Sequence, residues 1–406
     1  MLAIQHCSRE ELQRIRIACA YLFSPELAKQ DAFLRDLRGN ALRDAFREKA
    51  KRYHPDLHRN EPEDTILKRR DRFIKIRASF EFLKGRIVEE VGPSRPESEA
   101  HRAKVIAVGG AKGGIGKSIF AVNLGVTLSS LGKRTVMVDL DLGGANLHLY
   151  LGETAVARNI NDFLGNRVQS LREIESPTRY GPRLIGGDSS QLGAANIGFL
   201  RKLKLIKAIR ELQADYVVLD LGGDTSYNII DFFLAADCGL VLTTCDPASY
   251  LEAYNFIKVA LYRKLNRIFG AESSLGWKKN PALQRLIQEA TLGSNGNRVR
   301  DMEGLLEKIR KEHPRYLPGI EEILKDFRPG IVVNMISKET NEASVIQRIQ
   351  EVSTRMLSIE VVHLGNLPYQ KQVKRSAVNL VPVVSRHRTG VVARTIEEIS
   401  RRIAMS

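Results

Sequence analysis

The stretch KVIAVGGAKGGIGKSIFAVNLGVTLSSLG (104–132) decides the fold of this chain. Its first five residues form a β-branched apolar run, which is typical of a buried strand, and residues 119–132 have the apolar periodicity of a helix. Between them lies the glycine-rich sequence GGAKGGIGKS (109–118). Glycines allow backbone N–H groups to converge on an anion, and the N-terminus of the following helix adds a partial positive charge. This order of strand, loop and helix predicts a phosphate-binding loop.

Two side chains at the end of the loop carry the expected chemistry. Lys117 is expected to reach the β and γ phosphates of a nucleotide, and the Ser118 hydroxyl to bind Mg²⁺. The strict pattern GxxxxGK[ST] fails, because Ala111 stands at the first glycine position. The remaining KGGIGKS still predicts a site for ATP or ADP with Mg²⁺, and a glycine-rich turn without ligand is the alternative. The expected nucleotide-binding residues of the loop are Gly113, Gly114, Ile115, Gly116, Lys117, Ser118 and Ile119.

Short apolar runs recur along the rest of the chain and alternate with helical stretches. Strands in alternation with helices predict a parallel sheet that is covered on both faces. The fold class expected for residues 104–406 is therefore α/β, a three-layer P-loop NTPase with a mostly parallel sheet. A polar helical stretch at about 264–329 interrupts the alternation and is interpreted as an insertion. The further strands are expected at 135–139, 216–220, 239–244, 330–334 and 360–365.

Three aspartates follow these strands. Asp139 and Asp141 stand at the end of the second strand, and Asp220 ends the third. Because the carboxyl ends of parallel strands meet at the same edge of a sheet, we expect these carboxylates near the phosphate loop. The alternative for each one is a carboxylate that only caps a helix.

Before residue 104 the chain reads as helical. Residues 9–22, 41–53 and 67–84 carry apolar residues at helical spacing, with charges on the other face. The sequence VGPSRPESEAHRA (91–103) has two prolines and no apolar periodicity, which is typical of a linker. The expected organisation is a small all-α domain at 1–90, a linker at 91–103 and the α/β domain at 104–406.

Composition narrows the functional classes. The 406 residues carry 63 Lys and Arg against 47 Asp and Glu, so the net charge is +16. Such a surface attracts nucleic acid, anionic lipid or an acidic partner, and a merely solvated basic surface is the alternative. No apolar run is long enough for a transmembrane helix or a signal peptide, and the four cysteines form no CxxC pair. We therefore expect a cytoplasmic protein, with a peripheral position at a membrane or pole as the alternative.

A second lysine in the loop adds a resemblance. With Lys112, the sequence KGGIGKS resembles the deviant Walker A box, KGGxGK[ST], of the MinD/ParA family of P-loop ATPases. The resemblance implies that Lys112 crosses a dimer interface and contacts the phosphates bound by the partner subunit, so that ATP drives formation of a homodimer. It also implies that Lys117 and the loop amides, together with Mg²⁺, take up the charge that develops on the γ-phosphate.

The same resemblance assigns roles at the strand ends. It implies that Asp139 contacts Mg²⁺ through water and that Asp141 orients the attacking water. The segment YVVLDLGGDTS (216–226) resembles Walker B, which implies Asp220 in the Mg²⁺ shell and Gly223 at the γ-phosphate. The segments 332–335 and 366–384 resemble those that hold adenine, so that Asn334 would read the base and Pro368 would lie against it.

Three further segments resemble the MinD and FlhG branch of this family: residues 143–152, 180–193 and 243–258. This branch implies a switch ATPase that places flagella, a division site or other cargo, with a flagellar or polar protein as a partner. A ParA-like partition ATPase on nonspecific DNA is one alternative. The last helix carries Val392, Ile396, Ile399 and Ile403 on one face, which favours docking on the sheet over lying on a lipid surface.

The N-terminal region carries a resemblance of its own. His54, Pro55 and Asp56 follow the basic helix 41–53, and another helix, 72–85, comes next. This arrangement resembles a J domain, the DnaJ-type module, and implies two antiparallel helices joined by a loop that contacts a DnaK-type chaperone through these three residues. A chaperone adaptor is therefore another alternative function. The apolar residues Leu42 and Phe46 are expected to face Ile76 and Phe80 across the hairpin.

Overall fold

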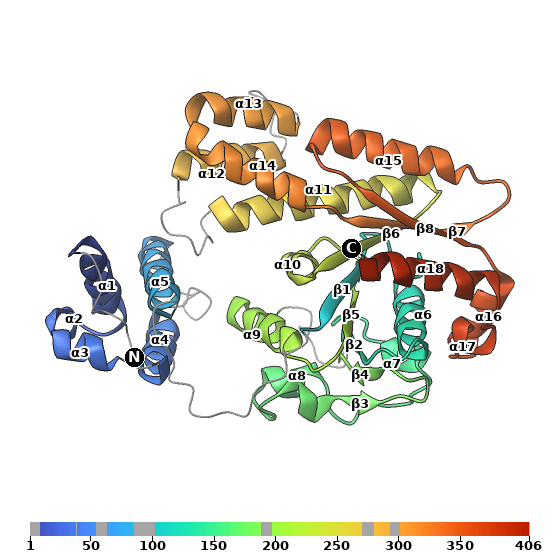
Figure 1. Ribbon diagram of the computed structural model, residues 1–406, viewed down its shortest axis with the longest axis horizontal. Helices are drawn as coiled ribbons and strands as arrows, with labels where there is room; N and C mark the ends of the chain where they lie inside the picture. Colours follow the sequence, from blue (N-terminus) through green and yellow to red (C-terminus); the bar gives the residue numbers. More distant parts are fainter. Residues whose placement is uncertain are drawn as a thin grey trace. The chain divides into compact units, whose positions relative to one another are not determined.

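The computed structural model describes residues 9–37, 39–53, 63–84, 102–187, 197–269, 280–292 and 301–405. The chain divides into two compact units, one of residues 1–99 with 266–285 and one of residues 100–265 with 286–406 (Figure 1). The expected linker at 91–103 lies almost entirely outside the described ranges, so the domain boundary near it stays a prediction.

The smaller unit holds a helical core at its N-terminal end. Phe46 and Phe80 stack with ring centroids 4.3 Å apart, so the fourth and fifth helices face each other as their apolar spacing predicts. Leu42 and Ile76 are buried in the same core, together with Ile15 from the first helix. The helices are α1 (Arg9–Leu22), α2 (Pro25–Lys29), α3 (Asp31–Asp36), α4 (Gly39–Tyr53) and α5 (Glu63–Lys84).

The feature that would distinguish a J domain is not visible here. His54, Pro55 and Asp56 lie in 54–62, outside the described residues. The pairing of α4 with α5 is the arrangement that the resemblance implies, but two packed amphipathic helices are common to many folds. The J-domain assignment therefore stays a prediction.

The larger unit is built on one sheet of eight strands. Their order is β3-β4-β2-β5-β1-β6-β7-β8, and every pair is parallel except β3 with β4 (Figure 1). This confirms the mostly parallel sheet expected from the sequence. The strands are β1 (Lys104–Gly109), β2 (Thr135–Leu140), β3 (Ser176–Pro177), β4 (Arg183–Ile185), β5 (Tyr216–Leu221), β6 (Cys238–Thr244), β7 (Gly330–Ile336) and β8 (Val362–Pro368).

Two of these strands were not expected. β3 and β4 have two and three residues, which is too short for an apolar run or an alternating pattern to stand out. β8 also begins two residues later than predicted and continues to Pro368, which can end a strand because its missing N–H is not needed there. The β3–β4 pair extends the sheet by an antiparallel edge.

Helices cover both faces of the sheet. α6, α7, α17 and α18 lie on one face, and α9, α10, α11 and α15 on the other (Figure 1). On the second face Phe233 of α10 meets Phe256 of α11 edge to face at 5.0 Å. The two rings press on β1, because a Cβ added at Gly109 would lie 2.9 Å from Phe256.

The helices that follow β1 in the chain begin and end as follows; the end of α11 and the start of α12 fall within 266–285, which belong to the smaller unit. They are α6 (Lys117–Ser130), α7 (Leu147–Tyr150), α8 (Ile160–Leu164), the 3-10 helix η2 (Leu171–Ile174), α9 (Phe199–Arg210), α10 (Tyr227–Ala235), α11 (Pro247–Phe269), α12 (Pro281–Leu292), α13 (Met302–Glu312), the 3-10 helix η4 (Pro314–Tyr316), α14 (Leu317–Asp326), α15 (Glu342–Leu357), α16 (Lys371–Val378), α17 (Val383–Arg386) and α18 (Val391–Met405). α11 runs through residue 264, where the polar insertion is expected to begin, and α12 to α14 supply its helices.

The last helix docks on the sheet, as its apolar spacing predicts. Val392, Ile396, Ile399 and Ile403 are all buried in one core with residues of α6 and the sheet. Gly365 of β8 permits the close approach, because a Cβ there would lie 2.8 Å from Ile399 Cγ1. No described helix is long and apolar enough to cross a membrane.

Candidate nucleotide site

The glycine-rich loop joins the carboxyl end of β1 to the N-terminus of α6. Gly116 precedes α6 with a φ of +89°, in the left-handed region that glycine adopts without strain. A Cβ at this position would also lie 2.7 Å from Asn334 Nδ2, so a side chain there would push against β7. At Gly113 and Gly114, in contrast, an added Cβ would meet nothing within 4 Å. The loop is therefore held at its base and open at its tip.

Lys117 lies at the centre of the site. Its ammonium donates a hydrogen bond to the carbonyl of Lys112 at 2.8 Å, and the residue is only 9% exposed. Burial lowers the pKa of Lys117, and the charges of Asp220 and Asp141 oppose that shift. A Cβ at Gly223 would lie 3.0 Å from Lys117 Nζ, so the structure brings the Walker B glycine to this lysine. The ammonium thus lies where the glycine-rich loop meets the segment after β5.

Asp139 and Asp220 are neighbours across two parallel strands. They occupy the same register position of β2 and β5, and each residue is 1% exposed. Burial raises the pKa of Asp139 to about 7, and the nearby charge of Asp141 adds to that shift. Burial, and then the charge of Asp139, raises the pKa of Asp220 well above its usual range, against the effect of the Ser118 hydroxyl. Two buried carboxylates side by side are costly unless a cation or a proton compensates them.

This carboxylate pair fits a divalent cation. Both oxygens of Asp220 are buried without a hydrogen-bond partner of ordinary geometry among the described residues. Oxygen ligands are those that Mg²⁺ prefers, and Mg²⁺ is commonly held by one or two carboxylates together with phosphates and water. Within the described ranges, no group of three or more His, Cys, Asp or Glu side chains is arranged to hold a metal alone. A Mg²⁺ ion here would therefore draw on Asp220 and Ser118 and would need phosphate oxygens to complete its shell.

The two aspartates after β2 differ in their surroundings. Asp139 accepts hydrogen bonds from the backbone N–H groups of Asp141 (3.2 Å) and Leu147 (3.0 Å), so it fixes the loop that follows the strand. Asp141 lies on that loop, and a Cβ at Gly222 would come within 3.1 Å of its Oδ1. The loop therefore presents the Asp141 carboxylate to the segment after β5, beside the carboxyl ends of both strands.

Asn334 holds the loop in this structure. Its Nδ2 donates to the carbonyl of Ile115 at 2.8 Å, and its Oδ1 accepts from the N–H of Met335 at 2.9 Å. The amide that the resemblance assigns to the base is thus engaged with the protein. Pro368 pairs with Ile336 at the end of β8, so it lies at the same edge of the sheet as Asn334.

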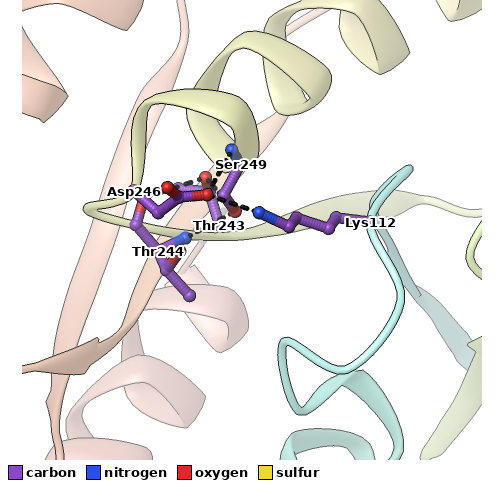
Figure 2. A network of polar contacts seen from close by, with 5 residues as sticks. All are labelled: Lys112, Thr243, Thr244, Asp246 and Ser249. Atoms are coloured by element: carbon purple, nitrogen blue, oxygen red, sulfur yellow. Dashed lines mark hydrogen bonds and ion pairs between the residues drawn. The ribbon is translucent and has the colours of Figure 1, made fainter.

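Lys112 forms an ion pair with Asp246 of the same chain (Figure 2). Asp246 precedes α11 and also accepts the Ser249 N–H at 3.1 Å, which satisfies a free donor of the first turn. The Ser249 hydroxyl in turn accepts the Thr244 N–H at 3.0 Å and lies 3.2 Å from Thr243 Oγ1. Lys112 is the residue expected to act on a partner subunit, but in the single chain its ammonium pairs with a carboxylate of its own chain.

Asp246 was missed as a site residue in the sequence. The dipeptide Asp246–Pro247 is a signal for a helix N-terminus, because aspartate caps helices well and proline suits the first turn. That signal indicates a cap but does not say which cation the free carboxylate oxygen meets. Only the tertiary structure brings it to Lys112.

Comparison with known proteins identifies the class. Residues 106–383 match the CobQ/CobB/MinD/ParA nucleotide-binding domain family, and the chain belongs to that family. The match covers more than half of the chain and includes the glycine-rich loop, Asp139, Asp220 and Asn334. The family resemblance drawn from the loop is therefore confirmed, whereas the N-terminal helices lie outside the match.

The chain is also similar to individual flagellar and septum-site proteins. The chain is 32% identical over 172 residues to the antiactivator FleN of Pseudomonas aeruginosa, and 31% identical over 164 residues to the flagellum site-determining protein YlxH of Helicobacter pylori. These alignments cover 42% and 38% of this chain, and 59% and 53% of the relatives, so the chain spans little more than half of their length. The septum site-determining protein MinD of Bacillus subtilis is 23% identical over 262 residues, which are 64% of this chain and 90% of that protein.

Solved structures of similar proteins include two MinD proteins. One is the MinC:MinD cell division complex of Aquifex aeolicus, with a TM-score of 0.49 and 19% identity over 75% of this chain and 96% of that chain. The other is MinD from Pyrococcus horikoshii, complexed with Mg-ADP, with a TM-score of 0.49 and 16% identity over 74% and 96% of the two chains.

Proposed function

We propose that this protein is an ATP-dependent, dimerising switch ATPase that controls the placement of flagella or of another polar or division-site cargo. The observation that carries the proposal is the buried carboxylate of Asp220, which has no hydrogen-bond partner of ordinary geometry among the described residues and lies beside Lys117 at the glycine-rich loop. This arrangement suits a nucleotide triphosphate with its divalent cation. Family membership supports the nucleotide, and the similarity to FleN and YlxH supports the flagellar role.

The residues then take separate roles in hydrolysis. Lys117 exchanges the Lys112 carbonyl for the β and γ phosphates, and the loop amides from Gly113 to Ile119 surround them. Ser118 and Asp220 would hold Mg²⁺, with Asp139 acting through a water molecule, and the ion would supply charge neutralisation on the phosphates. Asp141 orients a water molecule in line with the γ-phosphate, and the Gly223 backbone responds to its presence.

Dimerisation is the switching step. A second copy of the chain would receive Lys112, whose ammonium would leave Asp246 for the phosphates bound by the partner. Loss of the γ-phosphate removes that attraction and reopens the dimer. Asn334 and Pro368 would hold the base at the edge of the sheet, with Asn334 also anchoring the loop.

The test is a measurement of mass and ATP turnover with and without ATP. We expect wild type and Asp141→Ala to dimerise on ATP, Asp141→Ala to lose turnover, and Lys112→Ala to stay monomeric. Arg134→Ala, which removes an exposed cation just before the first residue of β2, at the opposite end of that strand from Asp139, is the matched control and should behave as wild type. If ATP changes neither mass nor turnover of the wild type, the switch proposal is wrong.

The N-terminal unit supports a second proposal, that of a J-like module for a DnaK-type chaperone. The packing of α4 against α5, with Phe46 on Phe80, is compatible with that module. The full chain should stimulate ATP hydrolysis by a DnaK-type chaperone, and His54→Gln should abolish the stimulation while ATP-dependent dimerisation persists. Equal stimulation by both forms would reject a J-domain role.

A further inference from the structure

A basic surface lies near the C-terminal end of the larger unit, on the segment that follows β8. From residue 361 to residue 396 the chain has six Lys and Arg residues and no Asp or Glu. The segment includes α16, α17 and the beginning of α18, which lie together at one corner of the unit (Figure 1). None of the six cations forms an ion pair within the described part of the chain. The six are Lys371, Lys374, Arg375, Arg386, Arg388 and Arg394.

One face of α16 concentrates these charges. Lys371, Lys374, Arg375 and Val378 follow the i, i+3, i+4, i+7 spacing of a single helix face, and all four are exposed. Ser376, on the other side of the helix, is buried. We call the four exposed residues the α16 basic face.

Apolar side chains are exposed on the α16 basic face and just beyond it. Val378 is 75% exposed, and two residues later Leu380 is 38% exposed. Leu380 has a φ of +53°, in the left-handed region that a leucine rarely adopts. A single exposed apolar side chain is ordinary, but here two of them adjoin unpaired cations, and one stands on a strained backbone.

The cations and the exposed apolar side chains together favour an anionic bilayer over a nucleic acid as the partner. Phosphates attract the cations in either a nucleic acid or an anionic bilayer, but only the bilayer offers Val378 and Leu380 an apolar medium at the same depth. Along a duplex they would stay in water. We propose that the α16 basic face binds the surface of an anionic lipid bilayer, with the cations at the headgroups and Val378 between the acyl chains. The last helix is not the contact, because its apolar face is buried against the sheet.

The experiment is co-sedimentation of the full chain with vesicles, without nucleotide, so that its result does not depend on the proposed ATPase. Vesicles of phosphatidylcholine alone are compared with vesicles that also contain phosphatidylglycerol. We expect binding only to the anionic vesicles. The triple variant K371Q/K374Q/R375Q should bind them about a hundredfold more weakly, since each cation near an anionic surface contributes roughly a factor of five.

Two further variants separate the causes. K308Q/R310Q/K311Q removes the same charge from α13 and should bind nearly as wild type. Val378→Ser keeps every charge and should weaken vesicle binding by about threefold to tenfold, because it removes the apolar contact. All substituted side chains of α16 are exposed, so the thermal unfolding temperature should not change.

Three results would overturn the proposal. They are equal binding to both kinds of vesicle, equal losses in the α16 and α13 triple variants, and an unchanged affinity in Val378→Ser. A short DNA duplex, tested by fluorescence anisotropy, covers the nucleic-acid alternative. The contrary result is that the protein binds DNA and not vesicles, with DNA affinity lost in the α16 triple variant and unchanged in Val378→Ser. That result would make this surface a nucleic-acid interface.

Discussion

Lys112 and Asp246 are 134 positions apart in the chain and form an ion pair at the edge of the sheet where the glycine-rich loop lies (Figure 2). The hydrogen bond from Lys112 lowers the pKa of Asp246, so the carboxylate stays ionised at neutral pH. Lys112 therefore takes part in two contacts within the chain: its ammonium pairs with Asp246, and its carbonyl accepts a hydrogen bond from Lys117. Binding of a nucleotide and of a second chain would have to break both contacts.

Replacement of Asp246 by asparagine should therefore favour dimerisation. Asparagine caps helices as well as aspartate does, so α11 keeps its N-terminal hydrogen bond. The ion pair is exposed and water screens its attraction, so we expect the dimer constant with ATP to rise by only up to about fivefold. Sedimentation velocity over a range of protein concentrations measures it. Glu360→Gln, which breaks the exposed pair with Arg328, is the matched control; weaker dimerisation in Asp246→Asn than in that control would show that Asp246 assists the dimer.

Removal of the Lys117 ammonium should strongly weaken nucleotide binding. In Lys117→Met the side chain still fills its buried position, but Asp220 and Asp141 then face the phosphates without a compensating cation. We expect ATP affinity to fall by about a hundredfold or more, since hydrogen bonds to charged groups are about twice as strong as neutral ones and the repulsion adds to their loss. Isothermal titration calorimetry measures it, with Lys133→Met as the control. Retained affinity would place the phosphates elsewhere.

The buried carboxylates should make the nucleotide-free protein less stable as pH rises. The pKa of Asp139 is about 7 in the folded chain and near 4 in the unfolded one, so the folded state binds more protons between these values. The free energy of unfolding should then decrease from pH 5 to pH 8. Asp220→Asn relieves the repulsion and should raise the free energy of unfolding at pH 8 by roughly 1–3 kcal/mol. The same variant should bind nucleotide with an affinity that no longer depends on Mg²⁺.

Urea denaturation at several pH values checks this prediction. The matched control is Asp224→Asn, an exposed aspartate on the segment after β5, which should follow the wild-type profile. A wild-type curve that is flat or rises between pH 5 and pH 8, together with no gain in Asp220→Asn, would contradict the assignment of a strained carboxylate pair.

A buried ion triad should matter more for folding than any surface pair. Asp231 of α10 accepts hydrogen bonds from Arg263 of α11 at 2.9 and 3.0 Å and pairs with Lys202 of α9. Burial raises the pKa of Asp231, but these hydrogen bonds outweigh it and hold the pKa below its usual range. Asp231→Ala leaves two buried cations without this carboxylate, so we expect a loss of about 3–5 kcal/mol in the free energy of unfolding.

The control for the triad is Glu360→Ala, which breaks an exposed pair and should cost under about 1 kcal/mol. A double variant, Asp231→Leu with Lys202→Met, tests whether uncompensated charge causes the loss. It removes one cation together with the carboxylate, so it should recover part of the lost stability. If Asp231→Ala is no more destabilising than Glu360→Ala, the triad contributes little to the packing of α9, α10 and α11.

The local sequence pattern alone predicted most strands of the α/β unit and the loop between β1 and α6. Six of the eight strands, the loop between β1 and α6, and the buried face of α18 follow from apolar runs and helical spacing, because burial of those side chains dominates the free energy of each element. Asp139 and Asp220 were expected near the loop for a topological reason, namely that the carboxyl ends of parallel strands share one edge. β3 and β4 were not foreseen, because segments of two and three residues pair through their backbone and leave no pattern in the side chains.

The sequence by itself therefore determined the class of this protein, since a glycine-rich loop between a strand and a helix can fold locally in few other ways. Only the tertiary structure decided which groups meet around that loop. Asn334 reaches Ile115 across 219 positions, and Asp246 reaches Lys112 across 134. Such contacts depend on strand order and on the approach of distant segments, and no local propensity encodes them. The charges of α16 show the same division, because their number is read from the sequence, while the shared exposed face with Val378 exists only once the helix has packed.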